Sequence, residues 1–142
     1  MSRIALAESD RDIDGCFTVM RELRTRLDHA TFTAQVKRQK ESNDYRLAYL
    51  EEGGEVMAVA GFRFMEFLAC GKVLYVDDLV TLARNRSKGF GDQLFDWLVD
   101  QAASKGCDQL HLDSGVQRFG AHRFYLRKRM DITDHHFALQ LR

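Results

Sequence analysis

The sequence has no proline, only three cysteines and no surplus of either charge. Cys16, Cys70 and Cys107 are widely spaced and odd in number, so they match neither a disulfide framework nor a CxxC metal site, and we expect reduced thiols. Basic and acidic residues number 21 each, so the formal net charge is zero. The chain therefore has no net positive charge to attract nucleic acid or an anionic membrane. We therefore expect neither nucleic acid nor a membrane as a partner.

Long hydrophobic runs are also lacking. No apolar segment approaches the roughly 20 residues of a membrane-spanning helix. The first residues, 1–6, have the pattern of a strand and not of a secretory signal. A chain of 142 residues is long enough to bury one hydrophobic core without disulfides or a structural metal. These features predict a single domain over residues 1–142 and a cytoplasmic location.

The N-terminal half has the pattern of a strand, two helices and a hairpin. Residues 4–7 predict the strand, and Ser9 or Asp10 is expected to cap the first helix. Glycines at 53 and 54, between two strand-like runs, predict the hairpin turn. The apolar residues that define the helices are Ile13, Phe17, Met20, Leu23 and Leu27 for the first and Phe32 and Val36 for the second.

The second half predicts a strand, a loop, a helix and a further strand. Residues 73–82 are rich in β-branched, aromatic and aliphatic side chains, and the segment after the loop carries apolar residues at helical spacing. Gly106 is expected to end the helix, and residues 109–113 alternate as a strand. Such a unit forms a right-handed crossover between parallel strands. A short helix near 121–125 and a closing strand over 132–141 are expected to follow.

Residues 84–91, with the sequence RNRSKGFG, connect the predicted strand to the predicted helix. Glycines let a ligand approach the backbone, and the start of a helix presents unpaired N–H groups, so this loop is typical of a phosphate site. The spacing matches neither the GxxxxGK of a Walker loop nor the GxGxxG of a dinucleotide site. It reads RxxGxG over 86–91, and the alternative is that the glycines serve close packing of helix on strand.

RxxGxG after a strand, followed downstream by Ala121-His122-Arg123-Phe124-Tyr125, resembles the GNAT superfamily of acyl-CoA-dependent N-acyltransferases. The similarity covers residues 74–141. It implies an α/β fold in which helices flank a mixed, mostly antiparallel twisted sheet, with a splayed parallel strand pair at the acyl-CoA site. The run AHRFYLR at 121–127 and the later His136-Phe137 are similar to the aminoalkylphosphonate N-acetyltransferases within that superfamily.

The resemblance also implies where acetyl-CoA, the expected cosubstrate, would bind. Its pantetheine arm would lie beside the strand residues Leu79, Val80 and Thr81. Its pyrophosphate would lie on the loop formed by Arg86, Ser87, Lys88, Gly89, Phe90 and Gly91.

Tyr125 falls where many members of this superfamily have a tyrosine near the thioester sulfur. This implies a general acid that returns a proton to the departing thiolate. The alternative for Tyr125 is an aromatic side chain packed into the core on one face of its helix.

The catalytic base is expected to be Asp78, because similar family members have an acidic residue there. An amine with a pKa near 10.4 costs about 4 to 5 kcal/mol to deprotonate at pH 7, so a carboxylate would help. Side chains at 77 and 78 point to opposite sides of a regular strand, so at most one is expected to face the cleft. Asp77 and Tyr75, acting directly or through water, remain alternatives. Another alternative is that Asp78 is satisfied at a strand bulge or by an arginine.

No metal is expected, because the histidines and acidic residues match no HExxH or similar spacing. One residue of the pair His135-His136 is a candidate for the acceptor pocket, with ordinary surface histidines as the alternative. The basic residues of the first helical region are candidates for recognising an anionic acceptor, and the alternative is a solvated face. They are Arg21, Arg24, Arg26 and His29.

The expected activity is that of an acetyl-CoA-dependent N-acetyltransferase, an enzyme that moves an acetyl group to the primary amine of a small molecule. Direct attack in a ternary complex is expected, since no cysteine lies in a motif that favours an acyl-enzyme. One alternative is a CoA-binding sensor or interaction module without turnover. The other is an acetyltransferase for protein N-termini or lysines. The resemblance also implies a homodimer as one option, since such domains often dimerise.

Overall fold

The computed structural model describes residues 1–142, which form two compact units, 1–111 and 112–142. The first unit contains nearly all of the regular structure. In chain order its elements are β1 (Ser2–Leu6), α1 (Asp10–Gly15), α2 (Phe17–Leu23), α3 (His29–Asn43), β2 (Arg46–Glu52), β3 (Glu55–Phe67), β4 (Gly71–Thr81), the 3-10 turn η1 (Ala83–Asn85), α4 (Phe90–Ser104) and β5 (Gln109–Leu112), whose last residue belongs to the second unit.

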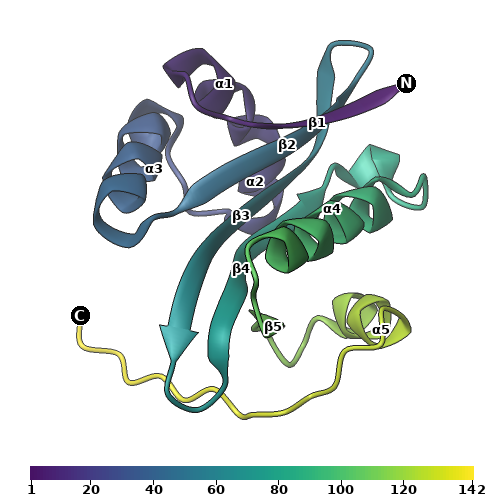
Figure 1. The fold of residues 1–142 in the computed structure, drawn as a ribbon. Coiled ribbons are helices and arrows are strands. Elements are labelled where there is room, and N and C mark those ends of the chain that lie inside the picture. The colour runs from purple at the N-terminus through teal and green to yellow at the C-terminus, as the bar shows by residue number, and fades with distance from the viewer. The chain divides into compact units, whose positions relative to one another are not determined.

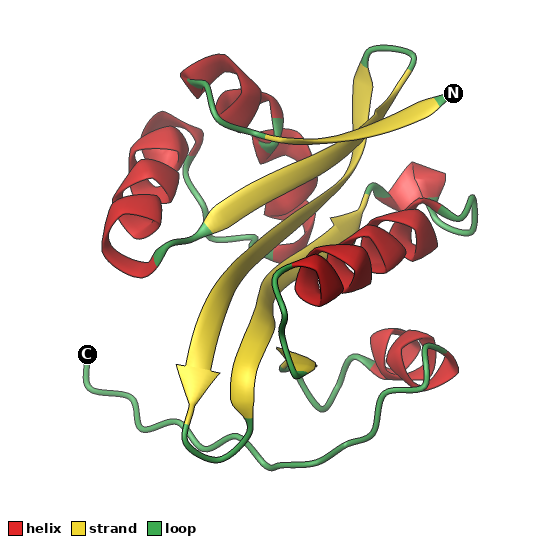
Figure 2. Ribbon diagram, viewed as in Figure 1, coloured by secondary structure: helices red, strands yellow, loops and turns green.

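The sheet of the first unit has the strand order β1-β2-β3-β4-β5 (Figure 2). The first four strands pair antiparallel, and β5 returns parallel to β4 after α4. Gly53 and Gly54, at φ values of +61° and +78°, make the predicted tight turn between β2 and β3. The mixed, mostly antiparallel sheet predicted from the sequence is therefore confirmed.

Helices cover both faces of this sheet: α1, α2 and α3 lie on one side and α4 on the other (Figure 1). Alternation along β2 explains the two layers, because Leu47 and Tyr49 join the core under the first three helices. On the other face, the ring of Phe62 packs edge-on against Trp97 of α4, with centroids 5.8 Å apart. The central strands are buried from both sides.

The N-terminal helical region differs from the prediction of one helix with a continuous apolar face. It consists of two short helices that meet at Cys16, which is at once the C-cap of α1 and the N-cap of α2. Gly15, a weak helix former, lies at this junction. The predicted cap is confirmed, since the Ser9 hydroxyl accepts a hydrogen bond from the Asp12 N–H at 3.1 Å.

The second unit contains α5 (Phe119–Arg127) and a C-terminal segment without helix or strand, drawn as a loop in Figure 2. The predicted closing strand over 132–141 is therefore wrong. The alternating residues Phe137, Leu139 and Leu141 are 85–91% exposed. Apolar alternation favours a strand only when a neighbouring strand supplies hydrogen bonds and a covered face, and here neither is present. None of the helices in the molecule combines the length and the apolar character needed to cross a membrane.

Candidate functional site

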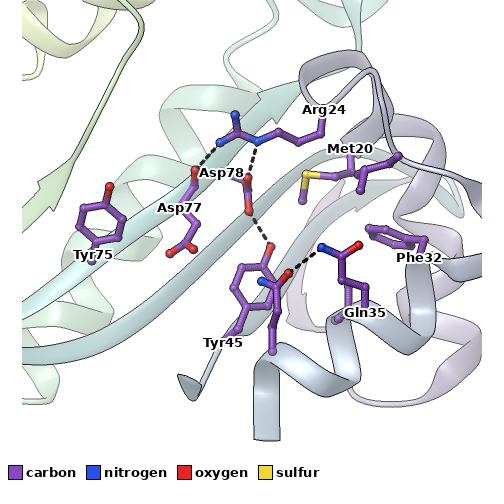
Figure 3. Close-up of a pocket in the computed structure, with 11 residues that line it drawn as sticks. Met20, Arg24, Phe32, Gln35, Tyr45, Tyr75, Asp77 and Asp78 are labelled. Carbon is purple, nitrogen blue, oxygen red and sulfur yellow. Dashed lines mark hydrogen bonds and ion pairs between the residues drawn. The ribbon is translucent and has the colours of Figure 1, made fainter. Parts of the chain in front are cut away.

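A cavity of about 370 Å³ lies in the first unit, where α2 and α3 pack beside the middle of β4. We call it the β4 cavity. Figure 3 shows Arg24, at the end of α2, and Tyr45 pointing toward the carboxylate of Asp78 on β4, with Gln35 on α3. It is lined by Met20, Arg24, Leu27, Phe32, Gln35, Val36, Gln39, Tyr45, Tyr75, Asp77 and Asp78.

A bulge in β4 brings both aspartates to this cavity. Gly61 of β3 is opposite Asp78, and the next residue, Phe62, is opposite Val76, so Asp77 is an extra residue in β4. Such a bulge breaks the strict alternation of side chains. Both residues line the cavity, but the carboxylate of Asp77 is bonded to Arg63, which does not line it, so the expectation that at most one carboxylate faces the cleft remains a prediction.

The carboxylate of Asp78 is held from two sides. The Tyr45 hydroxyl donates a hydrogen bond to its Oδ2 at 2.7 Å, and the Arg24 Nε donates to its Oδ1 at 2.7 Å (Figure 3). Burial, followed by the nearby Asp78 charge, raises the pKa of the Tyr45 phenol, which therefore stays a hydrogen-bond donor. The alternative in which a bulge and an arginine satisfy Asp78 describes the contacts seen here, and its role as a base remains a prediction.

Gly61 provides the space for the contact between Tyr45 and Asp78. A Cβ at this position would lie 1.8 Å from the Tyr45 hydroxyl oxygen and 2.6 Å from Asp78 Oδ2. Any side chain at 61 would therefore separate or displace these two groups. The sequence offered no sign of this, because Gly61 follows a run of apolar residues and resembles an ordinary strand glycine.

Asp77 also has a cationic partner. Arg63 of β3 donates from both Nε, at 3.0 Å, and Nη2 to the two oxygens of Asp77. The backbone oxygen of Asp77 accepts a further bond from Arg24 Nη2 at 2.7 Å. Arg24 thus connects the end of α2 to the bulge through two hydrogen bonds, although it is 54 residues from Asp78 in sequence.

The opposite wall of the cavity is apolar and amide-lined. Met20 and Phe32 are 2% and 3% exposed and belong to the core, and Leu27 is half-buried. The Gln35 Nε2 donates to the Gln39 Oε1 at 3.0 Å, so these two amides hold each other in place on α3. The cavity therefore has a charged side on β4 and a largely uncharged side on the helices.

Residues 84–91, which we call the anion loop, follow the end of β4 and lead into α4. Ser87 and Gly89 have φ values of +72° and +85°, and the N-terminus of α4 has no side-chain cap. The first helical bond runs from the Gln93 N–H to the Gly89 oxygen, so the preceding N–H groups of Phe90 and Gly91 have no helical acceptor.

Side chains of the anion loop add positive charge to these N–H groups. Arg86, Ser87 and Lys88 are exposed. Asn85, by contrast, is buried, with 5% of its surface exposed. Its side-chain oxygen accepts a hydrogen bond from Lys88 Nζ at 3.3 Å, and this bond holds the two ends of the turn together. Asn85 was not among the residues expected to shape this site. An uncapped, basic helix start of this kind fits a diphosphate, as expected for coenzyme A.

The predicted pantetheine residues Leu79, Val80 and Thr81 end β4 just before the anion loop. Val80 is buried in the core at 7% exposure, whereas Leu79 and Thr81 are half-buried. β3 pairs with one side of all three. β5 lies along the other edge of β4 and begins beside Lys72. It has 4 residues and β4 has 11, so β5 pairs only with the first part of β4 and leaves this edge unpaired farther along.

Tyr125 lies on α5 in the second unit. It is half-buried, and its ring contacts Phe124 edge-on at 5.6 Å. His136 Nδ1 lies 3.7 Å from Asp113 Oδ2 within the same unit, and His135 is exposed. No group of three or more His, Cys, Asp or Glu side chains in the molecule is arranged to hold a metal ion. The general-acid role of Tyr125 remains a prediction.

The sequence of the chain is similar to those of known acetyltransferases. The model of the acetyltransferase (GNAT) family matches residues 12–130. An uncharacterized N-acetyltransferase of Bacillus subtilis, YhdJ, is 38% identical over 112 residues, which are 79% of each chain. The aminoalkylphosphonate N-acetyltransferase of Salmonella typhimurium is 32% identical over 85 residues, which are 59% of this chain and 54% of that protein.

The fold is also similar to that of solved structures. One is AAC(6')-Iy in complex with a bisubstrate analogue, CoA-S-monomethyl-acetylneamine, with a TM-score of 0.84 over 100% of this chain and 99% of that one. At 12% identity this similarity concerns the fold alone.

Proposed function

Since the chain belongs to the acetyltransferase (GNAT) family, we propose that it transfers the acetyl group of acetyl-CoA to the primary amine of a small molecule. The observation that carries this proposal is the arrangement along β4. The strand passes the β4 cavity at Asp77 and Asp78 and then enters the anion loop. One rigid element thus connects a candidate acceptor site to a candidate donor site.

The donor would bind along the second half of β4 and the anion loop. The pyrophosphate of acetyl-CoA would accept bonds from the free N–H groups at the start of α4, with Arg86 and Lys88 supplying charge. The pantetheine arm would lie beside Leu79 to Thr81, where β5 no longer accompanies β4. Acetyl-CoA supplies an activated acetyl group as its thioester.

The acceptor would enter the β4 cavity as an ammonium ion and lose a proton to Asp78, directly or through water. The neutral nitrogen would then attack the carbonyl carbon of the thioester, so that a C–N bond forms and the C–S bond breaks. As the C–S bond breaks, the nitrogen would lose its second proton and Tyr125 would donate a proton to the departing thiolate; the proton from the nitrogen would reprotonate Tyr125 through solvent. Asp78 already has Arg24 and Tyr45 as partners, so an incoming ammonium would have to compete with Arg24.

The size of the cavity supports a small acceptor over a protein acceptor. A volume of about 370 Å³ between β4 and the helices α2 and α3 holds a molecule of a few tens of atoms at most. We further propose that residues 1–142 act as one acetyltransferase domain.

Release of free thiol from acetyl-CoA tests this proposal. The full chain is mixed with acetyl-CoA and a panel of primary amines, diamines, amino acids, peptides and aminoalkylphosphonates, the last because of the relative from Salmonella typhimurium. Amine-dependent release at a saturable rate is expected. Binding of acetyl-CoA without release for any amine would favour the non-catalytic CoA-binding module. Release with peptides alone would favour a protein acetyltransferase.

A further inference from the structure

The charges around the β4 cavity are unequal. Asp77 and Asp78 both line it, whereas Arg24 is its single cationic lining residue. The guanidinium of Arg24 is already committed to Asp78 Oδ1 and to the backbone oxygen of Asp77, both at 2.7 Å. Arg63 does not line the cavity and pairs with Asp77. An anionic group on the acceptor would therefore find no free cation here.

The other basic residues of the helical region do not supply one. His29 stacks on Phe17 with ring centroids 4.4 Å apart and contacts Asp14 at 2.8 Å. Arg21 lies over the same Phe17 ring at 5.8 Å. Neither residue lines the cavity, and Arg26 does not line it either. The hypothesis that these residues together recognise an anionic acceptor thus has only Arg24 at the cavity.

The remaining walls suit an uncharged molecular body. Met20, Leu27, Phe32 and Val36 line the cavity with apolar groups, of which Leu27 is half-buried and the other three are buried. The paired amides of Gln35 and Gln39 retain one acceptor and further donor hydrogens for a neutral polar group.

We infer that the cavity selects a primary ammonium compound with an uncharged, mainly apolar body, such as an arylalkyl or branched alkyl amine, over amines that carry a phosphonate or carboxylate. This inference rests on the proposed function for its acceptor site. The ammonium replaces Arg24 as the partner of Asp78, and the body lies against α2 and α3. An anionic amine must instead take Arg24 from Asp78 and leave that carboxylate without its cation, which opposes its binding.

A matched pair of amines isolates the charge. 2-Aminoethylphosphonate and its diethyl ester share the amine and the phosphorus centre, but only the former is anionic. 2-Phenylethylamine and 3-methylbutylamine test the apolar body. Each compound is measured with the full chain by thiol release and, separately, by calorimetric binding. We expect the ester and the two apolar amines to exceed the free phosphonate at least tenfold in kcat/KM and in affinity.

The two readouts separate this inference from the proposed function. If thiol is released but the free phosphonate is preferred, the inference fails and the function stands. If no amine causes release but the order of affinities is as expected, the function fails and the inference stands. If the free phosphonate binds more tightly than its ester, or if no amine binds, the inference is wrong whatever the rates.

A cation added to the cavity tests the inference, and the same cation added outside the cavity is the matched control. Gln35→Lys places a free cation on the cavity wall, and Ala34→Lys places the same charge on an exposed position of α3 outside it. Gln35→Lys is expected to raise the affinity for 2-aminoethylphosphonate relative to its ester at least tenfold, and Ala34→Lys to leave the ratio unchanged. The inference would be overturned if both variants changed this affinity ratio equally. It would also be overturned if Gln35→Lys left the ratio unchanged while thermal unfolding showed that the variant is folded.

Discussion

The anion loop follows the end of β4 and the β4 cavity lies beside the middle of that strand, but the two are built in opposite ways. The loop uses consecutive residues, backbone N–H groups and the exposed cations Arg86 and Lys88. The cavity uses side chains from four separate segments, and its charged groups are already paired with one another. Loop and cavity should therefore differ in how they respond to substitution, salt and pH.

The largest effect is expected for the carboxylate at the centre of the cavity. Asp78→Asn keeps an acceptor for Tyr45 but removes the group that accepts a proton, so kcat should fall by about 100-fold or more, with the KM for acetyl-CoA little changed. Steady-state kinetics at saturating acetyl-CoA measure this. Asp77→Asn is the control, and a larger fall there than in Asp78→Asn would move the base to Asp77.

Steric intrusion at Gly61 should damage the same site without altering any charge. Gly61→Ala forces the Tyr45 hydroxyl and Asp78 apart, which should cost about 1–3 kcal/mol of unfolding free energy and strongly reduce kcat. Gly15→Ala is the matched control, because a Cβ there meets nothing within 4 Å. Denaturant unfolding and thiol release of both variants provide the comparison. Full activity of Gly61→Ala would mean that the Tyr45–Asp78 contact is dispensable.

Neutralising the anion loop should give a smaller, salt-dependent effect on the donor alone. The double substitution Arg86→Gln with Lys88→Gln should raise the KM for acetyl-CoA by about tenfold at low salt, and the difference should shrink as salt screens exposed charges. Arg84→Gln is the control, since Arg84 pairs with Glu55. A KM effect that persists unchanged at 1 M salt would argue against this electrostatic role.

The smallest effect concerns stability at alkaline pH and involves only the buried groups. Burial raises the pKa of the Cys16 thiol to about 12 and also raises the pKa of Tyr45. Because the native state holds these protons longer than the unfolded state, the free energy of unfolding should fall as pH rises above about 9, by at most ~1.4 kcal/mol per pH unit for each group.

Two variants separate these contributions. Cys16→Ala should flatten the decline between about pH 9 and 10, where unfolded Tyr45 is still protonated, and Tyr45→Phe should flatten it only above about pH 10. Urea unfolding at several pH values measures the slopes. Unchanged slopes in both variants would place the alkaline sensitivity elsewhere in the molecule.

The same contrast explains what the sequence could predict. The anion loop is contiguous, so its glycines, cations and helix start could be recognised together, and so could the hairpin at Gly53-Gly54. The contact of Arg24 with Asp78 spans 54 positions and depends on where α2 ends, which no local pattern encodes. The bulge at Asp77 likewise follows from the pairing of β3 with β4 and overrides simple alternation.

The closing strand was predicted for a related reason. The alternation of apolar residues over 132–141 indicates that these side chains favour a strand. A strand also needs hydrogen-bond partners for its backbone, and a neighbouring strand from another part of the chain must supply them. The break between α1 and α2 lies where Gly15, a weak helix former, is followed by the fully buried Cys16, so local propensity and packing act at the same point. Local chemistry was therefore predictable, and long-range packing was not.

Two-substrate kinetics of the full chain test the central claim most directly. Thiol release is measured while acetyl-CoA and an apolar primary amine are varied independently, for the original sequence, for the loop double variant and for Gln35→Lys. We predict that the loop variant changes only the KM for acetyl-CoA and that Gln35→Lys changes only the KM for the amine. If substitutions in the loop alter the amine KM and those in the cavity alter the acetyl-CoA KM, the assignment of donor and acceptor sites along β4 is contradicted.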